Sequence, residues 1–117
     1  QSITPYRALD TRNGTGGRRG ALGPGGQYAV MVRGVGGVPA NADSVVVNVT
    51  AVAPSTTGHL TVWPSGQARP GTSTLNFSPG VTVPNLAFAK VGADGRIAVF
   101  NVAGNTHVVI DLLGYYL

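Results

Sequence analysis

Apolar and polar residues alternate along several short segments of the chain. The clearest is segment 44–52, in which Val45, Val47 and Val49 point one way while Val46 and Asn48 point the other. A period of two is that of a β-strand, because successive side chains of a strand point to opposite faces. The pattern therefore predicts a strand with one face in the core.

Similar patterns, separated by turn residues, predict a series of strands along the whole chain. The expected strands are 5–12, 27–33, 44–52, 59–63, 74–77, 85–91, 96–102 and 106–116. Within 59–63, Leu60 and Val62 are expected to point inward, and His59, Thr61 and Trp63 to lie on the opposite face. The last segment is a long β-type run that is expected to be held in a sheet up to its final residues.

The last third of the chain is expected to be a meander of neighbouring strands. Asp94-Gly95 is typical of a type I′ hairpin turn, and it is expected to join 85–91 to 96–102. Gly104-Asn105 then joins 96–102 to 106–116.

No segment shows the apolar period of a helix over a useful length. Short strands at close spacing, with Gly and Pro between them, predict an all-β fold. The expected architecture is a two-sheet antiparallel β-sandwich or jelly roll, with a small barrel as the alternative. A length of 117 residues fits one domain, so residues 1–117 are expected to form a single domain.

Composition supports the same fold class. The chain has 18 Gly and 8 Pro, no Glu and only one Lys, a balance that favours strands and turns over helices. Segment 13–26 is half Gly and is expected to be a loop. With no Cys, the chain has neither a disulfide nor a thiolate metal site, and four scattered Asp do not predict a calcium site, so neither a metal nor a cofactor is expected.

The formal net charge is +4, which favours anionic partners in general. The cations are spread along the chain, and only Arg18 and Arg19 adjoin, so nucleic acid is not expected as a partner. No stretch is apolar and long enough to cross a membrane, and membrane insertion is not expected. The start at Gln1 is typical of a mature or excised domain.

The titratable residues do not form a recognisable catalytic motif. His107 and Asp111 share one face of a strand but lie about 13 Å apart, too far for a hydrogen bond. No nucleophile elbow of the Gly-X-Ser-X-Gly type is present. Asp10 stands close to Arg7 and Arg12 and is expected in a structural ion pair. No catalytic residue is therefore expected, and the chain is interpreted as a protein without enzymatic activity.

Trp63 is the strongest candidate for a ligand site. It is the only Trp, and it shares the more polar face of its strand with His59 and Thr61. An exposed indole beside hydrogen-bonding groups can stack on the apolar face of a sugar ring, with Arg69 and Asn76 as further contacts. The alternative is a Trp half-buried at the edge of the sheet.

Asn residues fall in strand-like segments, where Asn is depleted. They are Asn48, Asn76, Asn85 and Asn101. We expect these side chains mainly to bond loop backbones inside the fold, and the alternative is that some line a ligand surface.

The order of several motifs resembles a β domain of secreted and surface-exposed actinobacterial proteins. The motifs are Arg7 to Arg12 (RALDTR), Gly37-Val38-Pro39, Val47 to Ala51 (VNVTA), Gly58 to Pro64 (GHLTVWP), Arg69-Pro70, Ser73 to Phe77 (STLNF), Asn85, Asp94-Gly95, and Asp111 through Gly114-Tyr115-Tyr116. Such domains occur alone, in tandem, or appended to exported hydrolases. The resemblance implies a non-catalytic accessory module that is secreted or held at the cell surface.

We therefore expect a secreted accessory module that binds carbohydrate or a cell-wall polymer through an exposed aromatic surface. The expected ligand-binding residues are Trp63, His59, Thr61, Arg69 and Asn76. The alternative function is a structural or self-assembly domain, since Val-rich sheets and few charges also suit a homo-oligomer.

Overall fold

The computed structural model describes residues 1–117, and it is all-β without a helix. The sequence-based prediction of the fold class is confirmed. The eight strands are β1 (Ser2–Asp10), β2 (Gln27–Met31), β3 (Ser44–Val52), β4 (Gly58–Pro64), β5 (Leu75–Phe77), β6 (Val83–Lys90), β7 (Arg96–Asn101) and β8 (His107–Tyr116).

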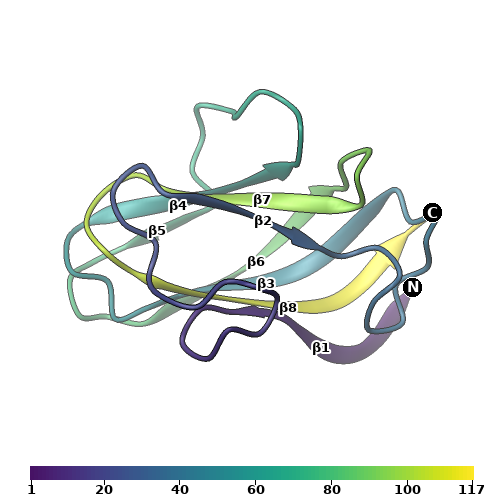
Figure 1. Ribbon diagram of the computed structural model, residues 1–117, viewed down its shortest axis with the longest axis horizontal. Coiled ribbons are helices and arrows are strands. Elements are labelled where there is room, and N and C mark those ends of the chain that lie inside the picture. The colour runs from purple at the N-terminus through teal and green to yellow at the C-terminus, as the bar shows by residue number, and fades with distance from the viewer.

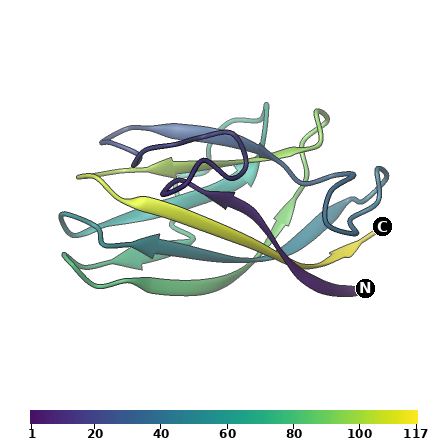
Figure 2. The ribbon, with the colours of Figure 1, turned by 60° about the horizontal axis from the view of Figure 1, so that its bottom comes forward.

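The strands form two four-stranded sheets in which every pair of neighbours is antiparallel. The first sheet has the order β1-β8-β3-β6, and the second has the order β2-β7-β4-β5. Figure 2 shows the two layers, with β2 and β7 above and β8, β3 and β6 below. Apart from β4 and β5, consecutive strands lie in opposite sheets, and this strand order is that of a jelly roll.

The predicted meander at the end of the chain is wrong. β6 pairs with β3 in the first sheet, whereas β7 pairs with β2 and β4 in the second, so Asp94-Gly95 turns the chain across one end of the sandwich. Only Gly95 has a positive φ (80°), while a type I′ turn needs positive φ at both central residues. The Asp94 carboxylate holds the turn, since it accepts hydrogen bonds from the Arg96 backbone N–H and the Ser65 hydroxyl.

The core lies between the two sheets. In β3 the residues predicted to share one face, Val45, Val47, Val49 and Ala51, are all fully buried, so this face is the one in the core. They belong to a single cluster of 21 buried apolar residues that takes members from both sheets. The apolar area removed from water in this layer is the main stabilising contribution.

Both ends of the chain lie at the same end of the sandwich (Figure 1). β8 runs between β1 and β3, and its final part pairs with the start of β1, where Ser2 is opposite Gly114. The Gln1 amino group also donates to the Tyr115 carbonyl at 2.9 Å. The C-terminal run is thus held in a sheet up to its final residues, as predicted, and it is a central strand of that sheet.

The glycine-rich loop 13–26 folds back along β1. The Asp10 N–H donates to the Thr15 carbonyl, and the Gly20 N–H donates to the Thr11 carbonyl. Gly16 has φ +84°, and a Cβ there would collide with the Ala8 carbonyl oxygen, so only Gly fits this close approach. The loop therefore covers part of the outer edge of β1.

Candidate functional site

Trp63 does not form the exposed aromatic surface that the sequence suggests. Its exposed fraction is 5%, and it packs with Ala98 and Phe100 on the outer face of the second sheet. The prediction of an exposed indole is wrong because the connection between β4 and β5, residues 65–74, folds back over this face. Figure 1 shows this connection above β4 at the top of the molecule.

Hydrogen bonds fasten the 65–74 connection to β4, and three of them involve side chains. The Trp63 indole N–H donates to the Gln67 carbonyl at 3.0 Å, and the Thr61 hydroxyl donates to the Thr72 carbonyl at 2.9 Å. The Val62 N–H donates to the Thr74 hydroxyl at 2.9 Å. Trp63 and Thr61 are thus occupied with holding a loop and present no surface to a ligand.

Arg69 is part of the same cover. Its guanidinium carbon lies 3.6 Å from the centre of the Phe100 ring, a cation–π contact that closes the loop over the sheet. The structure therefore brings together Trp63, Thr61 and Arg69, as the sequence predicts, but Trp63 and Thr61 are buried beneath the 65–74 connection and Arg69 is an exposed part of it.

His59 and Asn76 lie apart from that cluster. They are opposite each other in the pairing of β4 with β5, so they share the outer face near the edge of the second sheet. Asn76 is exposed and His59 is half-buried. Of the five predicted ligand contacts, Trp63 and Thr61 are buried, Arg69 is exposed but lies on Phe100, and His59 and Asn76 lie on an accessible surface away from that cluster.

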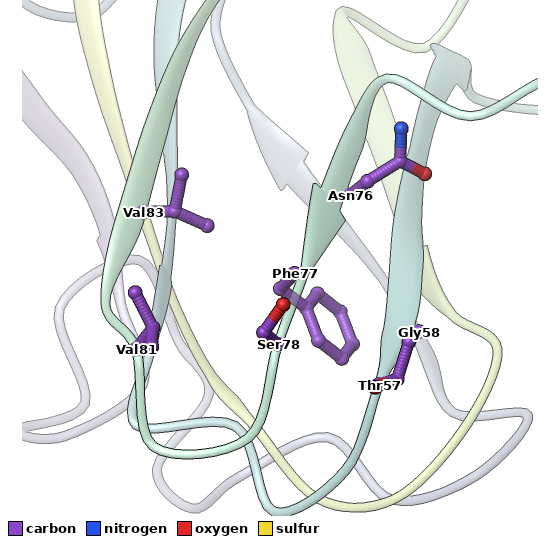
Figure 3. Close-up of a pocket in the computed structure, with 7 residues that line it drawn as sticks. All are labelled: Thr57, Gly58, Asn76, Phe77, Ser78, Val81 and Val83. Atoms are coloured by element: carbon purple, nitrogen blue, oxygen red, sulfur yellow. The ribbon is translucent and has the colours of Figure 1, made fainter.

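A groove lies between the edges of the two sheets, where β5 and β6 come close (Figure 3). Its volume is about 400 Å³. The lining residues are Thr57, Gly58, Asn76, Phe77, Ser78, Val81 and Val83. The Phe77 ring lies against Gly58, where a Cβ would come within 2.9 Å of it. The groove is uncharged, with valine and phenylalanine side chains inside and hydroxyl and amide groups at its rim.

Three large, exposed apolar residues lie on the outer face of the first sheet. Leu86 and Phe88 of β6 are 62% and 60% exposed, and Tyr116 of β8 is 54% exposed. The Phe88 and Tyr116 rings are 5.4 Å apart between centroids, and Val46 of β3 is the residue opposite Phe88. We name Leu86, Phe88 and Tyr116 the outer apolar patch.

Sequence reasoning missed this patch, although β6 carries a signal for it. Ala87 and Ala89 alternate with Leu86 and Phe88, and the small residues are the ones that face the other sheet. A strand that turns its larger apolar side chains to solvent reverses the usual pattern of a half-buried strand.

The charged residues of the first sheet form ion pairs, which confirms the predicted role of Asp10. The Asp10 carboxylate accepts bonds from the Arg12 backbone N–H and guanidinium, and it lies 3.3 Å from the Arg7 guanidinium. The bond from Arg12 is the main cause that lowers the pKa of Asp10 to about 2. Arg7 also binds Asp111 at 2.9 Å, and this bond raises the pKa of Arg7.

Other polar side chains relevant to catalysis or metal binding are His107, Thr11 and the residue types that bind metal ions. The His107 Nδ1 lies 2.8 Å from the Thr11 hydroxyl, and that hydroxyl also accepts the Val108 N–H. No cluster of three or more His, Asp, Glu or Cys side chains is placed to hold a metal ion. No helix in the structure is long and apolar enough to cross a membrane.

Two of the four Asn residues in strand-like segments bond loop backbones. Asn101 is fully buried, and its amide N–H group donates to the carbonyls of Leu22 and Gly104. Asn85 donates to the Thr74 carbonyl and thereby ties β6 to the chain that precedes β5. Asn101 and Asn85 bond loop backbones as expected, whereas Asn76 lines the groove.

Comparison with known proteins adds no further constraint on this site. No protein-family model matches the chain. No curated protein matches it either.

Proposed function

We propose that this domain is a non-catalytic assembly module whose first sheet associates with a second copy of the chain. The observation that carries the proposal is the outer apolar patch. Leu86, Phe88 and Tyr116 lie together on one face, and each exposes more than half of its surface. Scattered single apolar residues are normal on a surface, but a contiguous group of large ones marks an interaction site.

The size of the patch fits the centre of a protein interface. A large side chain of this kind buries about 150–250 Å² when it is covered, so three that are more than half exposed present on the order of 300 Å². That is comparable with the largest apolar patch on a typical monomer, which is about 300–600 Å² and often functional. A standard interface buries about 800 Å² on each partner, so the patch would need a surrounding rim.

The charge distribution favours a second copy as the partner. The first sheet and the turns at its ends carry three cations and three anions. These are Arg7, Arg12, Lys90, Asp10, Asp43 and Asp111. The rest of the chain holds five Arg against Asp94 alone, which accounts for the whole net charge of +4. Two copies that meet through this balanced face keep their excess positive charge apart.

The proposal is tested by the oligomeric state in solution. Light scattering after gel filtration, repeated from low micromolar to several hundred micromolar, should give a mass approaching twice the 11.9 kDa of the chain. The double variant Leu86→Ser/Phe88→Ser should remain monomeric over the same range. The matched control is Val102→Ser, which removes an exposed apolar residue that follows β7 of the second sheet and should dimerise as the parent does. A parent chain that stays monomeric at every concentration overturns the proposal.

The setting we propose is that of an exported or surface protein in which the domain is an accessory module. What supports this is the series of sequence motifs from RALDTR to DLLGYY, which resembles β domains of secreted actinobacterial proteins. Ion pairs and backbone bonds also occupy most of the titratable groups of the fold, in keeping with a structural role.

Carbohydrate or cell-wall polymer binding is the second candidate, and the groove of Figure 3 favours it over the Trp63 surface. The Asn76 amide and the hydroxyls of Thr57 and Ser78 form its rim, and Val81 and Val83 can meet the apolar face of a sugar. Co-sedimentation with chitin, cellulose, peptidoglycan and anionic wall polymers tests it, with Asn76→Ala as the variant. Retention of the parent but not of Asn76→Ala would support this function. Absence of retention on every polymer would remove it.

A further inference from the structure

The outer edge of β6 is the longest regular strand edge that no other segment covers. β6 has eight residues in unbroken register with β3, and Figure 2 shows it as the lowest strand of its layer. Among the other edge strands, β5 has three residues and β2 has five. β1 is interrupted by two register shifts, and its edge is partly covered by loop 13–26. An open edge of this kind is a template for pairing with another chain.

The hydrogen-bond pattern identifies which groups of β6 face outward. The Val91 N–H donates to the Asp43 carbonyl, so odd-numbered residues turn their backbone groups toward β3. In an antiparallel pair the bonded residues alternate, and the residues between them turn their N–H and C=O away. Leu86 and Phe88 therefore present free backbone groups to the edge as well as exposed side chains to the outer face.

We propose that two copies of the chain pair through β6, antiparallel and about a two-fold axis that passes at Ala87, joining their first sheets into one. This inference rests on the self-association proposed above and specifies its geometry, with Leu86 and Phe88 of the outer apolar patch at the contact and Tyr116, two strands away in β8, outside it. Leu86 of each copy lies opposite Phe88 of the other, and the members of such a pair exchange both backbone hydrogen bonds. The same pairing sets a leucine beside an aromatic ring on the outer face, twice by symmetry.

The ends of β6 select this register over its neighbours. Pro84 has no N–H to donate, and in this register it lies opposite Lys90 of the second copy, where the Lys90 N–H can still reach the Pro84 carbonyl. A shift of two residues in one direction places Phe88 opposite Pro84 and loses a bond from the centre of the pairing. A shift in the other direction places the Lys90 ammonium beside Leu86. A shift of one residue would place residues whose N–H and C=O point to the open edge opposite residues whose backbone groups point back to β3, so the two strands could not exchange hydrogen bonds.

The groove of Figure 3 opens on the same flank of the sandwich. It lies between β5 and β6, and it includes Val81, which is exposed at the start of this flank. A second copy placed along β6 extends over this flank, so Val81 adds apolar surface to the rim that the outer apolar patch requires. Polymer binding in the groove and pairing through β6 would then compete.

A cysteine cross-link tests the register directly, because the chain has no Cys of its own. Ala87 lies on the proposed axis, opposite its own copy in an unbonded pair with a Cα separation of about 4.5 Å. A disulfide spans Cα separations of about 4.4–6.8 Å. Ala87→Cys should therefore form a covalent dimer on mild oxidation, seen on a non-reducing gel and removed by reductant.

Asn85→Cys is the matched control. Asn85 is exposed on the same strand, yet in this register it is four residues away from its own copy, about 13 Å, which is beyond the reach of a disulfide. It should remain monomeric on the gel. A covalent dimer of Asn85→Cys without one of Ala87→Cys overturns the register.

Ala87 is partly buried against the core, so a second pair of variants guards against misfolding. A mixture of Leu86→Cys and Phe88→Cys, both at exposed positions, should cross-link between the two variants at a Cα separation of about 5.5 Å and more than within either alone. A parent chain that dimerises by light scattering while both cysteine tests fail overturns the pairing through β6 and leaves self-association standing. A parent chain that is monomeric throughout overturns both.

Discussion

Replacing Trp63 by Ala should lower the stability of the domain strongly, because the side chain is buried and bonded. The indole is 5% exposed, it packs on Ala98 and Phe100, and its N–H bonds to the Gln67 carbonyl. Truncation of a buried aromatic residue to Ala costs about 3–5 kcal/mol. A domain of this length has a total unfolding free energy of roughly 6–17 kcal/mol, so the variant should fold with a smaller margin.

The measurement is urea unfolding of parent and variant, followed by far-UV circular dichroism. The midpoint should fall while the dependence of the free energy on urea stays the same. Trp63→Phe retains a packed ring but loses the indole N–H, so it should lose less, about 1–2 kcal/mol. Met31→Ala, at an exposed position on the outer face of the second sheet, is the control and should stay close to the parent.

The single Trp provides a second readout in the parent protein. The emission of the buried indole should be blue-shifted and protected from an aqueous quencher until the domain unfolds or the 65–74 connection opens. A loss of less than about 1 kcal/mol in Trp63→Ala, together with free quenching in the parent, would show that the connection does not cover Trp63. The exposed aromatic platform expected from the sequence would then be correct.

Two further variants test polar contacts of the fold. Asp10→Asn should cost about 2 kcal/mol at neutral pH and little at pH 2, measured by urea unfolding across pH, because the pKa of Asp10 is lowered from 3.8 to about 2 in the folded state. The pKa of Asp10 is lower in the folded than in the unfolded state, so the parent has this stability in full above about pH 4 and loses it as the pH falls toward 2. The Asp10→Asn variant should not show this loss of unfolding free energy between about pH 4 and pH 2. Asn101→Leu keeps the side-chain volume but leaves the Gly104 carbonyl without its donor and removes one of the two donors to the Leu22 carbonyl, which still accepts the Thr106 N–H. The variant should therefore cost about 2–4 kcal/mol at every pH, and an unchanged urea midpoint would contradict the role given to Asn101.

Local pattern in the sequence was sufficient to predict the strands and the two faces of β3. The alternation along 44–52 places Val45, Val47 and Val49 on one face, because the period of a strand is a local property, and the structure shows that this face is buried. Sheet membership is not local. Asp94-Gly95 does form a turn, but the partners of β6 and β7 are chosen by contacts far along the chain, so a turn motif alone predicted a hairpin wrongly.

In the candidate site, too, local pattern was predicted correctly and long-range contacts were not. The sequence correctly placed His59, Thr61 and Trp63 on the face opposite Leu60, but it could not show that residues 65–74 return to cover two of them. The exposed patch was missed for a related reason. Its members come from β6 and β8, which are separated by β3 in the sheet and by a long stretch of chain, so their contact exists only in the fold.

The placement of both chain ends at one end of the sandwich has a mechanical consequence. β1 and β8 are antiparallel neighbours, and Ser2 lies opposite Gly114 at the position where both strands meet the ends of the chain. Tension applied between the two ends pulls these strands apart from that position, so it loads their hydrogen bonds one after another and never all together. The domain should therefore unzip at low force, with β1 leaving first and β8 losing its place between β1 and β3 afterwards. A polypeptide that carries this module in line would therefore lengthen at this point when a low force is applied.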